Sequence, residues 1–430
     1  MFDRELLSKI RTQFPRAETD FSGRKRAFFD NGTGTLVVGR AAEAEAEARV
    51  NCSANVDGLF DESKKATDII LEGRKAVADL LSAPSPDTII SGESATALLF
   101  NLSYAIGREL TGKENVVATD YDHYANISPW MELERRRKIQ KVRFARFKKD
   151  EGTLDMEYLK GLIDNKTKVV AVTAASNLLG TKSPLKEIGK MAEEADAYFV
   201  VDAVHHIVHG SMDVKALDCD FLVFSGYKFF TSHGSFLYGK KDHLETLKPY
   251  KVASAPDHVP EKWEWGTRDQ SMFAAIQGVI DYFVWLADQV QDGYADSLTE
   301  YSGCRRSLKA AMNAVEKYET KLSKMVLAGV GDIKGLRDMS KVKVYGLTDL
   351  KRLEERDPTF AFKVENRSDQ EIVNRLWTEG GIAARTEDYY SRAIEPYNQQ
   401  NMIRISLVHY NTPEEIRVFL KTLMRAQSSI

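Results

Sequence analysis

The stretches YFVVDAVHH (198–206) and FLVFSGYKFF (221–230) each contain a short apolar run followed by a residue capable of chemistry. Both runs are too short to cross a membrane, and they are as apolar as buried parallel strands whose sheet is covered by helices on both faces. The first run ends on Asp202 and the second on Lys228. Open α/β sheets bind ligands at the carboxyl ends of their strands, so we expect this carboxylate and this amine to share a ligand site.

A Lys and an Asp in these positions suggest the cofactor pyridoxal phosphate (PLP). The amine of Lys228 would form a Schiff base with the cofactor aldehyde, and Asp202 would keep the pyridine nitrogen protonated so that the ring can accept electrons. Both residues also have a structural interpretation, Lys228 as a solvated strand end and Asp202 as a turn or helix cap.

The composition predicts a soluble globular enzyme. The chain has 430 residues, 43% hydrophobic and 29% charged, with a net charge of -3, which is enough for two domains and gives no electrostatic reason to expect nucleic acid or a membrane surface as a partner. Three scattered cysteines indicate neither a disulfide framework nor a Cys-rich zinc site. No signal-peptide pattern or membrane-length apolar run is present, so we expect a cytoplasmic protein.

Strand and helix patterns alternate from residue 88 to 240, which indicates a mostly parallel sheet wrapped by helices. A turn at Gly266 and a long apolar helix then lead to helices and short strands typical of a smaller α+β domain. We therefore expect an N-terminal segment at 1–27 that packs on the small domain, a large domain at 28–285 and a small domain at 286–430.

Two further segments are candidates for ligand contact. In TIISGESATALLF (88–100), a strand turns into a helix that begins near Ser94, and the free N–H groups and dipole of such a helix attract phosphate. A purely structural helix cap would use the same residue types. His123 follows the next strand and could stack on a flat ring or be an ordinary surface or core residue. The glycines of FFDNGTGTLV (28–37) match no nucleotide-binding fingerprint, so we expect no nucleotide role there.

Seven motifs in order resemble the class V aminotransferase family of fold-type I PLP enzymes, and within it the cysteine desulfurase-like and isopenicillin N epimerase-like branch. The resemblance covers about residues 28 to 410. It implies an α/β fold, with a large PLP-binding domain built on a mostly parallel, seven-stranded type of sheet between helices and a smaller C-terminal α+β domain, and a homodimer with a shared active site. The motifs are SGESATALLF, TDYDHYANISPW, AASNLLGTKSPL, VVDAVHHIVHG, FSGYKFF, WEWGTR and IRISLVHYNT.

The resemblance also implies roles for individual cofactor-binding residues. Lys228 would carry the cofactor and later move the substrate Cα proton, Asp202 would pair with the pyridine nitrogen, and His123 would stack on the ring. His205 and Asn177 would lie near the phenolic oxygen. The residues implied at the phosphate are Ala95, Thr96, Ser225 and Tyr227, with Gly266 and Thr267 lent by the neighbouring subunit.

Two arginines are implied on the substrate side. Arg404 would hold the α-carboxylate, a task that suits the planar fork of a guanidinium. Arg385 could line the substrate entrance or belong to an ordinary surface loop.

The chain departs from true cysteine desulfurases, which carry a persulfide-forming cysteine in the segment matching GIAARTEDYYSRAIEP (381–396). Here that segment has Glu387, Asp388, Tyr389 and Tyr390 and no cysteine, and Tyr227 stands where many desulfurases have His. We therefore do not expect a persulfide mechanism.

The histidines at 205, 206 and 209 have a spacing that could bind zinc on a helix, but they follow a strand and His205 already has a cofactor role, so no metal is expected.

These observations predict a PLP enzyme acting on a small α-amino acid. The favoured reaction is elimination of a β-substituent, a sulfur group, without a persulfide cysteine. The alternatives are an aminotransferase, an amino-acid racemase or epimerase and, from another class, a non-catalytic PLP-binding scaffold or regulator. A nicotinamide dehydrogenase is disfavoured because no G-x-G-x-x-G follows a strand.

Overall fold

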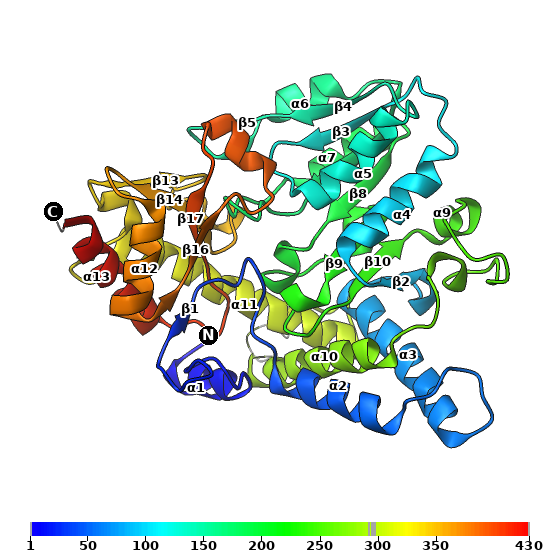
Figure 1. Cartoon of the computed structure of the whole chain (residues 1–430), viewed down its shortest axis with the longest axis horizontal. Helices are drawn as coiled ribbons and strands as arrows, with labels where there is room; N and C mark the ends of the chain where they lie inside the picture. The colour runs from blue at the N-terminus through cyan, green and yellow to red at the C-terminus, as the bar shows by residue number, and fades with distance from the viewer. Residues whose placement is uncertain (1, 291–292, 294–297, 429–430) are drawn as a thin grey trace.

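The structure, a computed structural model, describes residues 2–290, 293 and 298–428. Its centre is a seven-stranded sheet with the order β2-β10-β9-β8-β7-β3-β4 (Figure 1). All neighbouring pairs are parallel except those made by β10, so the predicted mostly parallel sheet is confirmed. The strands are β2 (Ile89–Gly92), β3 (Asn115–Thr119), β4 (Lys141–Ala145), β7 (Thr167–Thr173), β8 (Tyr198–Asp202), β9 (Phe221–Ser225) and β10 (Ser235–Gly239).

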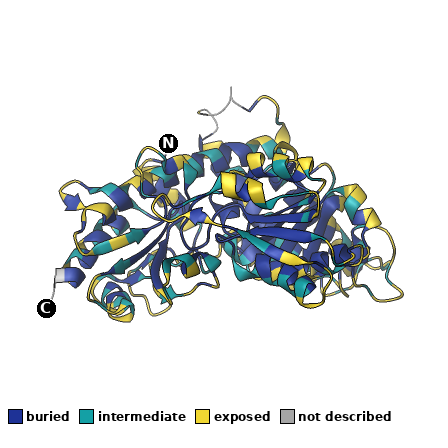
Figure 2. Ribbon diagram, turned by 90° about the horizontal axis from the view of Figure 1, so that it is seen from above, coloured by how far each residue is buried: buried dark blue, intermediate teal, exposed yellow. Residues whose placement is uncertain are grey.

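Helices cover both faces of this sheet because successive residues of each strand point to opposite sides. In β8, Val200 belongs to the same buried cluster as residues of α4 and α5, whereas Phe199 and Val201 belong to the cluster that includes residues of α3, α7 and α10. Each such valine, fully buried, contributes about 1.5–3 kcal/mol to folding. The strands therefore form the dark, buried middle layer of Figure 2, with exposed residues on the outer helices. The helices around the sheet are α3 (Asp61–Leu80), α4 (Ala95–Gly107), α5 (Tyr124–Arg135), α6 (Met156–Leu162), α7 (Leu185–Glu194), α8 (Val214–Leu217), α9 (Lys241–Thr246) and α10 (Gln270–Val290).

A second, antiparallel sheet with the order β13-β14-β17-β16 lies toward the C-terminus and packs on helices α12 and α13 (Figure 1). The long helix α11 (Gly303–Ala328) leads from α10 to this sheet. The elements of this part are β13 (Val342–Tyr345), β14 (Thr359–Val364), α12 (Asp369–Gly380), β15 (Ile382–Ala383), β16 (Arg385–Glu387), β17 (Met402–Ser406) and α13 (Pro413–Ser428). Short pairs are formed by β5 (Phe147–Lys148) with β6 (Thr153–Leu154) and by β11 (Gly329–Val330) with β12 (Ile333–Lys334).

The N-terminal segment packs against both parts. Helix α1 (Arg4–Thr12) is tied to α13 by the ion pair of Arg11 with Glu415 at 2.9 Å, and β1 (Ala27–Phe28) pairs with β15. The next helix, α2 (Gly39–Asn51), packs on α10, where an added Cβ on Gly278 would lie 2.7 Å from the carbonyl of Arg40. These contacts agree with the expected packing of the first residues on the C-terminal part, while the domain boundaries themselves stay a prediction.

Among the described residues, no helix combines the length and the apolar character that crossing a membrane requires.

Candidate active site

A cavity of about 380 Å³ opens where the large sheet meets the smaller one, at the carboxyl ends of β8 and β9. Except for Gly266 and Thr267, all residues predicted for the site line this cavity. They are Ala95, Thr96, His123, Asn177, Asp202, His205, Ser225, Tyr227, Lys228, Arg385 and Arg404.

Lys228 lies at the end of a single 3-10 turn, Gly226–Lys228, and not at the end of a strand as expected. Strand β9 stops at Ser225 because the chain turns at Gly226, whose carbonyl accepts N–H groups from Phe229 and Thr231. The amine donates a hydrogen bond to the carbonyl of Gly32. Burial, followed by the positive charge of Arg404, lowers the pKa of Lys228 to about 7, so a large share of the amine is neutral and nucleophilic near neutral pH.

Asp202 ends β8 as predicted and is almost fully buried. One carboxylate oxygen accepts the N–H of Val204 at 2.9 Å. Burial raises the pKa of Asp202 to about 6, and the Val204 N–H and the charge of Lys228 oppose that shift. The group is therefore mostly an anion at neutral pH and able to hold a protonated ring nitrogen.

His123 caps α5, with its Nδ1 accepting the N–H of Ala125 at 3.0 Å. Burial, followed by the charges of Lys228 and Arg404, lowers the pKa of His123 to about 4, so the ring is neutral. Its centre lies 5.9 Å from that of Tyr390. A flat, neutral ring on the cavity wall can cover one face of a heteroaromatic ligand.

The first turn of α4 forms another side of the cavity. Ser94 caps this helix by accepting the N–H of Ala97 at 3.1 Å. The N–H groups of Ala95 and Thr96 have no helical partners because they lie in the first turn. Ser225, whose Oγ accepts a hydrogen bond from Ser235, faces the same cavity. Together these groups suit a phosphate.

Arg404 enters the cavity from β17 and is 2% exposed. Its Nη1 donates to the carbonyl of Asn177 at 2.8 Å and its Nη2 to Oγ1 of Thr33 at 2.7 Å. The guanidinium carbon lies 3.7 Å from the centre of the Tyr389 ring. Burial lowers the pKa of Arg404, which nevertheless stays a cation at neutral pH.

The turn at residues 30–33 is the main part of the site that the sequence did not predict. Gly32 and Thr33 line the cavity, and a Cβ on Gly32 would lie 2.9 Å from Cζ of Arg404. Asp30 binds Arg385 at 2.9 Å and lies 3.8 Å from Arg404. The glycines of this turn match no nucleotide-binding fingerprint, and no local signal in the sequence links them to Arg404. The segment that holds Glu387, Tyr389 and Tyr390 also lines the cavity, and the role of Arg385 at a substrate entrance stays a prediction.

Gly266 and Thr267 lie outside the cavity. Glu264 anchors their loop, because its carboxylate binds Arg74 at 2.6 Å and the backbone N–H of Ser91 at 2.8 Å. Thr267 lines a separate hollow of about 620 Å³ beside Gly92. The expected contact of these two residues with the cofactor phosphate of a neighbouring subunit stays a prediction.

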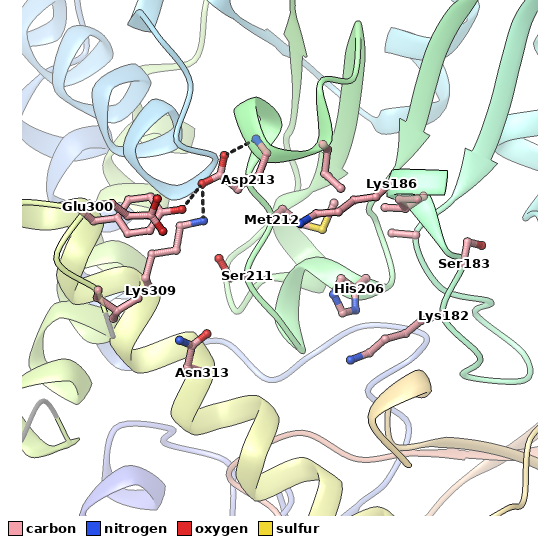
Figure 3. Close-up of a pocket in the computed structure, with 16 residues that line it drawn as sticks. Lys182, Ser183, Lys186, His206, Ser211, Met212, Asp213, Glu300, Lys309 and Asn313 are labelled. Atoms are coloured by element: carbon pink, nitrogen blue, oxygen red, sulfur yellow. Dashed lines mark hydrogen bonds and ion pairs between the residues drawn. The ribbon is translucent and has the colours of Figure 1, made fainter. Parts of the chain in front are cut away.

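The consecutive histidines 205 and 206 line different cavities. His206 belongs to the wall of a hollow of about 430 Å³, opposite Asp213 and Lys309, which pair at 3.0 Å (Figure 3). His206 pairs with Asp357 at 3.0 Å, and His209 pairs with Glu319 at 2.8 Å. His205, His209 and Asp357 each bring one possible ligand atom within 4.8 Å of the others, so the expected absence of a metal stays a prediction.

The fold and this cavity define a PLP-dependent enzyme of fold type I, and the comparisons with known proteins agree. The family model of the class-V aminotransferases matches residues 27–302 and 303–419, so the chain belongs to that family and uses PLP, as expected. It is 27% identical to the cysteine desulfurase of Serratia proteamaculans, over 98% of each chain. It is 29% identical to the aminotransferase-like protein FGM3 of Gibberella zeae, over 95% of this chain and 96% of that one.

Solved structures share the fold. The apo cysteine desulfurase from Thermococcus onnurineus superposes with a TM-score of 0.83 at 24% identity, over 99% of this chain and 98% of that one. The cysteine desulfurase CsdA from Escherichia coli has a TM-score of 0.78 at 21% identity, with the same coverage. The expected fold-type I architecture and resemblance to the cysteine desulfurase-like branch are therefore confirmed.

The residues of the cavity fit PLP chemically. A buried amine with a lowered pKa suits the aldehyde, a buried carboxylate suits the pyridine nitrogen, and a helix N-terminus suits the phosphate. Oδ1 of Asn177 and Nε of Arg404 are buried without a hydrogen-bond partner among the described residues. A polar ligand in the cavity would supply such partners.

Proposed function

We propose that the chain is a PLP-dependent lyase that eliminates a β-substituent, a sulfur group, from a small α-amino acid without forming a persulfide on the protein. The observation that carries this proposal is that Lys228, Asp202 and Arg404 line one cavity whose described lining contains no cysteine. The names of the cysteine desulfurase relatives support a carbon–sulfur bond as the target.

The cysteines support the part of the proposal that excludes a persulfide. Cys52 and Cys219 are buried, and Cys304 is half-buried. Burial raises the pKa of Cys304 to about 11 and that of Cys219 further, which disfavours the reactive thiolates. The carbon–sulfur bond would therefore break with release of sulfide or a thiol, and no cysteine of the protein would take up the sulfur.

In this proposal each side chain of the cavity has a separate role. Arg404 binds the substrate carboxylate, and Thr33, Asn177 and the ring of Tyr389 hold the guanidinium in place. The neutral amine of Lys228 accepts the proton from the substrate Cα. Asp202 holds a proton at the pyridine nitrogen, and His123 covers the ring. Bound PLP supplies the electron sink that makes the Cα proton acidic.

The experiment that tests the function follows the absorbance of the purified PLP-loaded protein while cysteine, cystine, S-substituted cysteines and alanine are added. Release of sulfide or a thiol together with pyruvate would support the lyase. Transamination is the second candidate, favoured by the name of the Gibberella relative. Conversion of bound PLP to its amine form, reversed by a keto acid, would replace the lyase with an aminotransferase.

We further propose a homodimer in which Gly266 and Thr267 reach the phosphate of the neighbouring subunit. The proposal is supported by the adjacent Trp265, which is 58% exposed, and by the position of this loop beside the β2–α4 turn. Sedimentation of the wild-type protein at micromolar concentration tests it, and a monomer that binds PLP fully would contradict it. A cytoplasmic location stays a prediction.

A further inference from the structure

His205, Thr359 and Ser406 form a chain of three buried polar side chains beside the cavity. Nε2 of His205 lies 3.1 Å from Oγ1 of Thr359, which lies 2.6 Å from Oγ of Ser406. The histidine is 4% exposed and the two hydroxyl residues are fully buried. Thr359 and Ser406 are cross-strand partners on β14 and β17.

The direction of these hydrogen bonds follows from the number of available acceptors. Within the described part of the chain, the Ser406 hydroxyl has no partner other than Thr359, so its proton must go to Oγ1 of Thr359. The Thr359 hydroxyl must then donate to Nε2 of His205. If Nε2 carried a proton instead, one buried hydroxyl proton would have no acceptor, which buried polar groups avoid.

The other ring nitrogen of His205 opens onto the cavity. Nδ1 makes no hydrogen bond to a described residue and is not one of the buried unpartnered atoms, and the residue lines the cavity. Of the titratable groups that act on His205, His209 is paired with Glu319 and Asp357 with His206, while Lys228 and Arg404 line the same cavity. Burial holds the pKa of His205 well below its usual value, in agreement with a neutral ring.

We infer that Thr359 is a positioning residue, whose hydroxyl donates to Nε2 of His205 and thereby fixes the imidazole as the Nδ1–H tautomer with a neutral N–H donor facing the cavity. The tautomer is a property of the chain alone. Its consequence for the cofactor rests on the proposed function, in which His205 lies near the phenolic oxygen of PLP and would donate to it. A neutral donor stabilises a phenolate there without adding a charge.

The tautomer can be measured in the purified protein labelled with ¹⁵N-histidine. Long-range proton–nitrogen NMR correlations distinguish the two neutral tautomers, and the His205→Gln variant identifies the His205 signals by their loss. We expect a protonated Nδ1 and an unprotonated Nε2. A protonated Nε2 on His205 would overturn the inference. Because the spectrum needs no turnover, this result is independent of which reaction the enzyme catalyses.

Matched variants test the role of Thr359. Thr359→Val keeps the shape but removes the donor, and we expect the Nδ1–H population of His205 to fall several-fold. Thr359→Ser should restore it, and Ser406→Ala should leave it unchanged because Thr359 can still donate to Nε2. Thr88→Val is the control, since Thr88 is equally buried but bonds to Ser85 at 2.6 Å.

An unchanged tautomer in Thr359→Val would show that Thr359 does not position His205. Should Thr359→Val fail to fold, Thr359→Ala removes the same hydroxyl with a smaller side chain, and the wild-type spectrum still decides the tautomer.

Discussion

The guanidinium of Arg404 lies over the ring of Tyr389, with its carbon 3.7 Å from the ring centre. Tyr389 has a left-handed backbone, with φ of 54°, and its hydroxyl donates to the carbonyl of Arg385 at 2.6 Å. The ring is 3% exposed. The segment that contains Tyr389 thus covers the proposed carboxylate-binding residue with an aromatic face.

This stacking predicts different effects for two Tyr389 variants. Tyr389→Leu removes the aromatic face and should weaken amino-acid binding by about 2- to 30-fold, the effect of a cation–π contact of about 0.5–2 kcal/mol. Tyr389→Phe keeps the face and should change binding less. Titration of the cofactor absorbance with substrate measures both affinities. Equal effects of the two variants would mean that the hydroxyl and not the ring supports Arg404.

Replacing Arg404 by Lys should weaken substrate binding by roughly 10- to 100-fold, because an ammonium cannot make the paired hydrogen bonds of a guanidinium to a carboxylate. Attachment of PLP to Lys228 should persist, since Arg404 contacts Asn177 and Thr33 and not the lysine. Arg385→Lys, at a more exposed arginine of the same cavity, is the matched comparison. If only Arg385→Lys lost affinity for the amino acid, Arg385 and not Arg404 would bind the substrate carboxylate.

Lys228→Ala should abolish the borohydride-stable linkage of PLP to the protein and lower turnover by roughly 10³-fold, within the range of losses for a general base. The melting temperature of the variant should stay near that of the wild type. Lys215→Ala, at an exposed lysine, controls for a general effect of removing an amine. Detection of the reduced linkage in the wild type on a lysine other than Lys228 would disprove the assignment.

The lowered pKa of Lys228 predicts a pH dependence of stability in the cofactor-free protein. The folded pKa is about 7, against 10.5 for the ordinary side chain. Between these values the unfolded chain binds more protons than the folded one, so the free energy of unfolding contributed by Lys228 rises with pH across this window. Chemical denaturation from pH 7 to 10 should show a steeper rise for the wild type than for Lys228→Met, and parallel slopes would contradict the buried-amine interpretation.

Gly32→Ala should displace Arg404, because the new Cβ would meet Cζ at 2.9 Å and Cβ of Ser406 at 3.1 Å. We expect about a tenfold or greater loss of substrate affinity with PLP still bound. Gly34→Ala is a closely matched control, since its nearest contact would be Tyr227 at an ordinary 3.5 Å. Affinity in Gly32→Ala equal to that in Gly34→Ala would show that the close approach is not required.

The half of the site on the large sheet could be predicted from sequence because its signals are local. Asp202 and Lys228 follow short apolar runs, and Ser94 caps a helix directly after a strand. The predicted strand is too long, because it ends at Lys228 whereas β9 ends at Ser225. Apolar content alone does not show that the chain turns at Gly226. The antiparallel direction of β10 follows from its connection to β9, which is too short for a parallel crossover.

The half of the site on the smaller sheet depends on contacts that no local pattern encodes. Thr33 meets Arg404, and Asp30 meets Arg385, only because the N-terminal turn lies against β16 and β17. The role of Arg404 came from the resemblance of IRISLVHYNT to a family motif, and the residues that hold the guanidinium became visible only in three dimensions.

The distribution of these residues along the chain has a consequence for biosynthesis. The residues of the cavity that are proposed to hold the cofactor lie between residues 95 and 228, whereas the contact of Thr33 with Arg404 spans 371 residues. On the ribosome, which makes the chain from its N-terminus, Lys228 and the start of α4 are made well before Arg404, and β10, which joins β2 to β9, follows soon after Lys228. The groups proposed to recognise the amino acid are therefore the last part of the site to be made.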